Sequence, residues 1–135
     1  MSALLSRLAV CTAALSFGVV AGANPPCDGI KKQISVERQK SLQTSVAKQL
    51  NASTVDLLAV FTSGEWSVLY VDTHQSDEVF LFYSADPANT AFLNMWSGAA
   101  IRNEAPAIEA WALKNAPGIP KALAGCFAWY ATAGR

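Results

Sequence analysis

The sequence holds little of the chemistry on which enzymes usually rely. His74 is its only histidine, no Gly-x-Ser-x-Gly elbow surrounds a serine, and the glycines are scattered singly instead of forming a phosphate-binding loop. A transition-metal site usually needs more than one histidine or cysteine, and no dedicated Ca²⁺ loop is present. The sequence therefore predicts no cofactor, no metal and no catalytic residue.

Lysine and arginine are missing from the whole stretch between Lys48 and Arg102. The acidic residues of that stretch are Asp56, Glu65, Asp72, Asp77, Glu78 and Asp86. The stretch is also rich in aromatic residues, whereas a nucleic-acid-binding protein shows a basic face with interleaved aromatics. We therefore expect no nucleic-acid partner, and an electrostatic field that attracts a basic protein.

No apolar run is long enough for a membrane span, which needs about 20 residues. The shorter apolar run 8–20 follows Arg7 and precedes the small-residue site 21–23, an order typical of a secretory signal peptide. We predict that residues 1–23 are removed. The remaining domain, 24–135, is then expected in the periplasm or outside the cell, without stable membrane association. An uncleaved membrane anchor is the alternative.

Cleavage removes Cys11 and leaves two cysteines, Cys27 and Cys126. An exported chain folds in an oxidising compartment, where a lone pair of cysteines usually bonds. A disulfide between them would close a loop of about 100 residues and contribute on the order of 4 kcal/mol. A redox pair is the less favoured interpretation, because such pairs usually have the spacing Cys-x-x-Cys.

Capping residues and helical spacing predict helices over 36–50, 103–115 and 120–132, with Ser35 and Asn103 as caps of the first two. Alternating apolar residues between turn signals predict strands over 55–62, 66–74, 79–84 and 90–96. Short connections indicate antiparallel neighbours. The expected fold class is therefore α+β, with an N-terminal helix, a four-stranded antiparallel meander and two C-terminal helices packed on the sheet.

The third predicted strand is apolar on both faces. Phe80 and Phe82 alternate with Val79, Leu81 and Tyr83, whereas a sheet with one wet face should alternate apolar and polar residues. Either helices cover both faces, which we favour, or one face meets a ligand or a partner. The second arrangement would allow a homodimer.

The candidate binding residues lie around the second strand. His74 and Asp72 are expected on the same face of that strand, and Asp77 and Glu78 follow across the turn. A histidine among carboxylates can act as a general base or hold a metal, although polar residues also simply crowd the exposed end of a hairpin. At the start of the strand, Trp66 beside Glu65 is the tryptophan whose burial is least certain. The predicted binding residues are Glu65, Trp66, Asp72, His74, Asp77 and Glu78.

These observations favour an exported, non-enzymatic binding protein, such as an inhibitor or an immunity-type partner of a basic exported enzyme. The reasons are the missing catalytic constellation, the bridged scaffold and the acidic middle of the chain. One alternative is a small hydrolase or lyase that uses His74 with a nearby carboxylate. Another is a carrier of an apolar small molecule held between the sheet and the helices.

The signal-peptide hypothesis predicts that the natural product begins at Asn24 and has no free thiol. Intact-mass measurement of the protein from its own host, before and after treatment with an alkylating reagent, checks both statements. A retained leader, or two alkylated cysteines without prior reduction, would contradict them.

Overall fold

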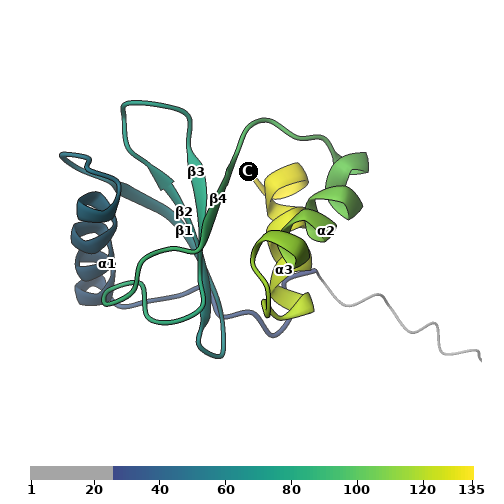
Figure 1. The fold of residues 1–135 in the computed structure, drawn as a ribbon, viewed down its shortest axis with the longest axis horizontal. Coiled ribbons are helices and arrows are strands. Elements are labelled where there is room, and N and C mark those ends of the chain that lie inside the picture. The colour runs from purple at the N-terminus through teal and green to yellow at the C-terminus, as the bar shows by residue number, and fades with distance from the viewer. Residues whose placement is uncertain (1–25) are drawn as a thin grey trace, which may run out of the picture.

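The computed structural model describes residues 26–135 as a sheet between two helical layers; the predicted leader 1–23 lies outside the described residues. Helix α1 (Val36–Gln49) covers one face of the sheet, and helices α2 (Ala105–Asn115) and α3 (Lys121–Trp129) cover the other face (Figure 1). The strands are β1 (Asp56–Ser63), β2 (Trp66–Asp72), β3 (Val79–Tyr83) and β4 (Asn94–Ser97). The predicted α+β fold class is confirmed.

The four strands form an antiparallel meander in the order β1-β2-β3-β4. Tyr70 of β2 pairs with Phe80 of β3, which in turn pairs with Trp96 of β4. Strand β1 forms one edge, where the register shifts between Leu57 and Ala59. Consecutive strands therefore lie side by side, although the connection from β3 to β4 is longer than a hairpin turn.

Strand β3 separates two hydrophobic cores. Phe80 and Phe82 belong to the core beneath α2 and α3, whereas Val79, Leu81 and Tyr83 belong to the core beneath α1. All five side chains are buried. Helices therefore cover both faces of the strand, as the sequence favoured.

Helix α1 begins and ends where local chemistry predicts. The Ser35 hydroxyl accepts a hydrogen bond from the backbone N–H of Arg38 at 3.1 Å, which is an N-cap. Leu42 and Val46 form the buried stripe. Just after the helix, Asn51 has a φ of 51°, the left-handed conformation that asparagine tolerates at helix ends.

Gln49 connects α1 to the loop between β3 and β4. Its amide nitrogen donates hydrogen bonds to the carbonyl oxygens of Pro87 and Thr90, both at 3.0 Å. Its amide oxygen accepts a hydrogen bond from the Tyr83 hydroxyl at 3.0 Å, and burial raises the pKa of that hydroxyl above its usual range. The long loop thus has a fixed attachment to the first helix.

Three predicted element boundaries are wrong. Strand β2 ends at Asp72 because His74 has a φ of 60°, which is incompatible with a strand. Strand β4 begins only at Asn94. Asn103 does not cap α2 but lies in a 3₁₀ turn, and Glu104 occupies the N-cap position without a side-chain hydrogen bond to the helix. Its carboxylate instead accepts from the Ile101 N–H, before the turn, at 2.7 Å.

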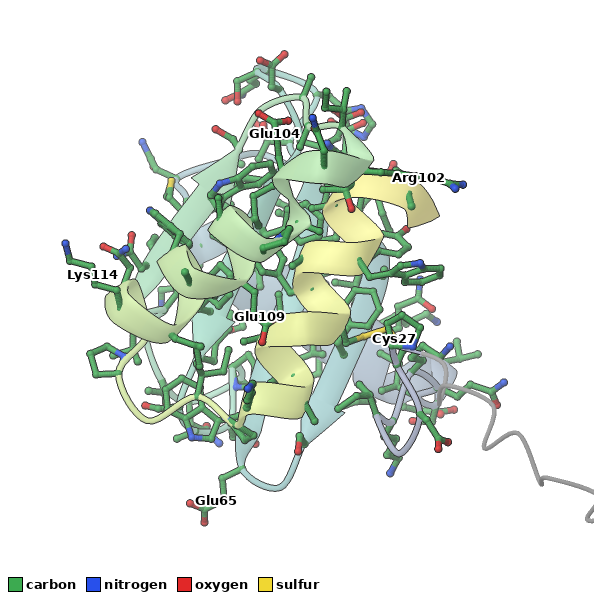
Figure 2. The ribbon with its side chains drawn as sticks, turned by 90° about the vertical axis from the view of Figure 1, so that its right-hand side faces the viewer. Cys27, Glu65, Arg102, Glu104, Glu109 and Lys114 are labelled. Atoms are coloured by element: carbon green, nitrogen blue, oxygen red, sulfur yellow. A yellow bond between two sulfur atoms is a disulfide. The ribbon has the colours of Figure 1, made fainter. Side chains whose placement is uncertain are left out.

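The predicted disulfide is confirmed. Cys27 and Cys126 are bonded across a sequence separation of 99, and both are buried in the core beneath α2 and α3. Figure 2 shows Cys27 beside α3. The segment after Cys27 is also held at the sheet, because Lys31 and Thr62 exchange two backbone hydrogen bonds of 3.0 and 2.8 Å.

Across residues 26–135, no helix combines the length and the apolar character that a membrane crossing would require.

The position of the disulfide leads to a stability prediction. The double variant Cys27→Ser/Cys126→Ser should lose about 2–5 kcal/mol of unfolding free energy, because the bond restricts nearly the whole unfolded chain. Urea denaturation followed by circular dichroism measures the loss, and the wild type in excess reductant should match the variant. An unchanged midpoint in both samples would show that the bond does not stabilise the fold.

Candidate functional site

Four carboxylates gather at one end of the sheet. Asp56 opens β1, Asp72 closes β2, and Asp77 and Glu78 immediately precede β3. Asp56 and Asp72 are direct cross-strand partners, and the pairing of Val71 with Val79 brings Glu78 next to them. We call Asp56, Asp72, Asp77 and Glu78 the acidic end of the sheet.

His74 lies between two carboxylates of the acidic end. Its Nε2 forms a hydrogen bond of 2.8 Å with Asp56, and its Nδ1 lies 3.3 Å from the Asp72 carboxylate. The His74 backbone N–H donates to the other Asp72 oxygen at 2.7 Å. The left-handed conformation of His74, rather than its expected place on the strand, brings the imidazole to both carboxylates.

The position of His74 bears on an electrostatic conflict. Asp56 and Asp72 face each other across the strands, and like charges in directly opposite positions are destabilising. The His74 imidazole lies between the two carboxylates and forms a hydrogen bond with Asp56. Over residues 26–135, none of the four carboxylates of the acidic end has a lysine or arginine within ion-pair distance.

The described part of the chain contains no group of three or more histidine, cysteine, aspartate or glutamate residues that could hold a metal ion.

Two of the sequence-predicted binding residues lie elsewhere. Glu65 and Trp66 belong to the hairpin between β1 and β2, and the length of β2 separates them from Asp72 by about 20 Å. Figure 2 shows Glu65 projecting away from the helices. Trp66 packs against the core beneath α2 and α3, and a Cβ at Gly118 would meet its ring at 3.3 Å. The structure therefore brings Asp72, His74, Asp77 and Glu78 together, but not Glu65 and Trp66.

Asp86 is not part of the acidic end either. It forms an ion pair of 2.5 Å with Arg38 of α1. The hydrogen bond from Arg38, followed by one from the Ala88 N–H, lowers the pKa of the Asp86 carboxyl. Arg38 of α1 thus neutralises one acidic residue of the stretch that lacks lysine and arginine. Arg38 forms no ion pair with the acidic end.

Sequence reasoning missed an arginine packed on aromatic rings next to the acidic end. The Arg135 guanidinium carbon lies 5.8 Å from the ring centroids of Tyr70 and Phe80 and 5.9 Å from that of Trp96, within the range of cation–π attraction. Burial and then the neighbouring Tyr70 raise the pKa of Tyr130, whereas the charge of Arg135 acts in the opposite direction.

A sequence signal for this cluster exists. Tyr70, Phe80 and Trp96 occupy paired positions on consecutive strands, so they form one row across the sheet. A correct register between the strands would have predicted the row. We call these three side chains the aromatic row.

Two hollows meet at Asp77. The first, of about 300 Å³, is lined by Asp77, Glu78, Gly98, Ala99 and Arg135. The second, of about 320 Å³, lies on the α1 side, and its lining includes Leu50, Val79 and Met95. A carboxylate beside an apolar wall suits lysine and arginine side chains, which bury their aliphatic stems and keep their charge at the rim.

A larger groove of about 770 Å³ runs between α2 and α3. Its floor includes the small residues Ala122, Gly125 and Ala128, and Trp129 lies at its side. Glu109 lies between the two helices (Figure 2), and its carboxylate would be 3.7 Å from a Cβ at Gly125. The two helices therefore approach each other closely at Gly125, which lines the groove.

Comparisons of this chain with protein-family models, with curated proteins and with solved structures found no match.

The groove leads to a second stability prediction. Gly125→Ala should raise the free energy of unfolding by about 0.5–1 kcal/mol, because a helix-interior glycine costs that much relative to alanine. The added methyl would make only ordinary contact with Glu109. Thermal and urea unfolding measure the gain.

Gly134→Ala is the matched control. A Cβ at Gly134 would meet Tyr130 at 2.8 Å, so this variant should show no gain or a loss. A destabilised Gly125→Ala would mean that the helices need a closer approach than the structure describes.

Proposed function

We propose that this chain is an exported binding protein that takes a basic protein partner at the acidic end of its sheet. The observation that carries the proposal is the convergence of Asp56, Asp72, Asp77 and Glu78 without lysine or arginine partners among the described residues. Surface carboxylates that are not neutralised attract basic surfaces and accelerate their encounter. An inhibitor or immunity-type role toward a basic exported enzyme fits this chemistry.

The shape beside the carboxylates supports the same partner. Asp77 borders two hollows, and the one on the α1 side combines it with apolar contacts to Leu50, Val79 and Met95. Met95 is exposed, and methionine adapts to differently shaped partners. A basic side chain could place its stem on these apolar residues and its charge at Asp77.

The proposed location follows from the covalent chemistry. The Cys27–Cys126 disulfide is typical of an oxidising compartment, since cytosolic thiols are kept reduced. Together with the leader pattern, it supports a periplasmic or secreted protein. A partner exported to the same compartment would meet the folded, bridged form.

Neutralising the acidic end tests the proposal. Immobilised wild type, incubated with the exported fraction of its own host, should retain a basic protein that Asp77→Asn/Glu78→Gln retains about tenfold less. The loss is expected because both carboxylates are exposed and, within residues 26–135, neither forms a side-chain hydrogen bond that would stabilise the fold. About 1 M salt, where the Debye length is roughly 3 Å, should release the partner.

Asp28→Asn/Glu37→Gln is the matched control, since it removes the same charge from exposed positions outside the acidic end. Glu65→Gln tests separately whether the hairpin between β1 and β2 contributes to partner binding. Equal retention by the control and by Asp77→Asn/Glu78→Gln, or retention that ignores salt, would rule out the acidic end as the binding surface.

A further inference from the structure

Arg135 is held by contacts that recognise a guanidinium group. Its Nη2 donates to the Gly98 carbonyl at 2.8 Å and its Nε to the Ala131 carbonyl at 3.1 Å. Its Nη1 lies 3.5 Å from the Tyr70 hydroxyl, a long and weak hydrogen bond. Together with the aromatic row, these oxygens offer a planar cation both cation–π attraction and hydrogen-bond acceptors.

The rings of the aromatic row are also held by contacts that do not involve Arg135. Tyr70 stacks on Phe80 with centroids 4.3 Å apart, and Phe80 packs edge-to-face on Phe127 at 4.9 Å. Trp96 is fixed against Phe127 as well, at 5.7 Å. The binding surface is therefore part of the core beneath α3, whereas the arginine that covers it comes from the turn after α3.

Arg135 does not use every group near it that attracts a cation. The hollow that it lines also contains Asp77 and Glu78, yet no ion pair joins Arg135 to either carboxylate. An arginine of the partner could contact the aromatic row, and basic residues next to it in the partner could then contact these carboxylates. Charge-assisted contacts of that kind are stronger than the neutral carbonyl contacts alone.

We propose that the aromatic row, with the Gly98 and Ala131 carbonyls, is a guanidinium-binding site that Arg135 occupies in the free protein and an arginine of the partner occupies in the complex. The inference rests on the proposed function, because the basic partner supplies the incoming arginine. Arg135 is then an internal competitor. The apparent affinity for outside cations equals the intrinsic affinity multiplied by the fraction of time that Arg135 leaves the site free.

The test uses the full mature chain and a capped arginine, N-acetyl-arginine amide, as the probe. Arg135→Ala should bind the probe at least about tenfold more tightly than the wild type, because the internal competitor is gone. Isothermal titration and the NMR shifts of the Trp96 ring measure binding. N-acetyl-citrulline amide, which has the same shape without the charge, should not bind.

Arg102→Ala is the matched control, since it removes an exposed guanidinium that borders the same hollow as Arg135 but has no cation–π contact with the row, and it should behave as the wild type. If Arg135→Ala unfolds at too low a temperature for the titration, Arg135→Gln takes its place, because it keeps a hydrogen-bonding side chain. The same increase in affinity for the probe is then expected. Equal affinity of wild type, Arg135→Ala and Arg135→Gln for the probe, or equal binding of citrulline, overturns the inference.

The two proposals fail separately. The capped-arginine assay needs no partner, so a negative result there, with salt-sensitive capture at Asp77 and Glu78 intact, removes only the guanidinium site. With the captured partner, Arg135→Ala should bind several-fold more tightly than the wild type. Weaker binding would make Arg135 a contact residue itself and overturn its role as a competitor.

Discussion

The burial of β3 on both faces is the constraint on which the rest of the structure depends. Its five side chains alternate between two cores, so neither face of the central strand can meet water. One helix must cover one face and a pair of helices the other, as Figure 1 shows. Only the edges and the two ends of the sheet then remain for polar groups. The acidic end collects carboxylates from the ends of three strands, and the same alternation that buries Phe80 builds the aromatic row beside it.

Local chemistry made much of the fold predictable, and non-local geometry accounts for the rest. Ser35 and the stripe of Leu42 and Val46 act within a few residues of each other, so α1 could be placed within one residue of its ends. His74 was expected on a strand because alternation cannot reveal a left-handed residue, whose backbone N–H donates to the Asp72 side chain in the turn. Asn103 does not cap α2 because a 3₁₀ turn, in which the Glu104 carboxylate accepts from the Ile101 N–H, takes up residues 102–104 before the helix begins, and composition does not reveal such a turn.

The candidate site was likewise predictable where its contacts are local in the sequence, and not where they are distant. The grouping of Asp72, His74, Asp77 and Glu78 followed from one hairpin, whereas the contribution of Asp56 required the strand register. The pairing of Arg38 with Asp86 joins residues 48 positions apart, and the contact of Arg135 with Tyr70 spans 65. Contacts of that sequence separation follow from how layers pack, which spacing along the chain does not encode. Glu65 and Trp66 were grouped with the others because they lie at the start of the strand that Asp72 closes, although a strand places its two ends on opposite sides of a domain.

The covalent tie between the beginning of the domain and its last helix also sets an order of events during biosynthesis. Cys27 emerges 99 residues before Cys126, and at about 5–20 residues per second the first sulfur waits roughly 5–20 s for its partner. The sequential strand pairs and α1 can assemble in that interval, since each is local in the chain. The bond can therefore close only after the residues of α3 have been made. Until then the Cys27 thiol has no partner in Cys126, and thiol–disulfide exchange could join it to another thiol.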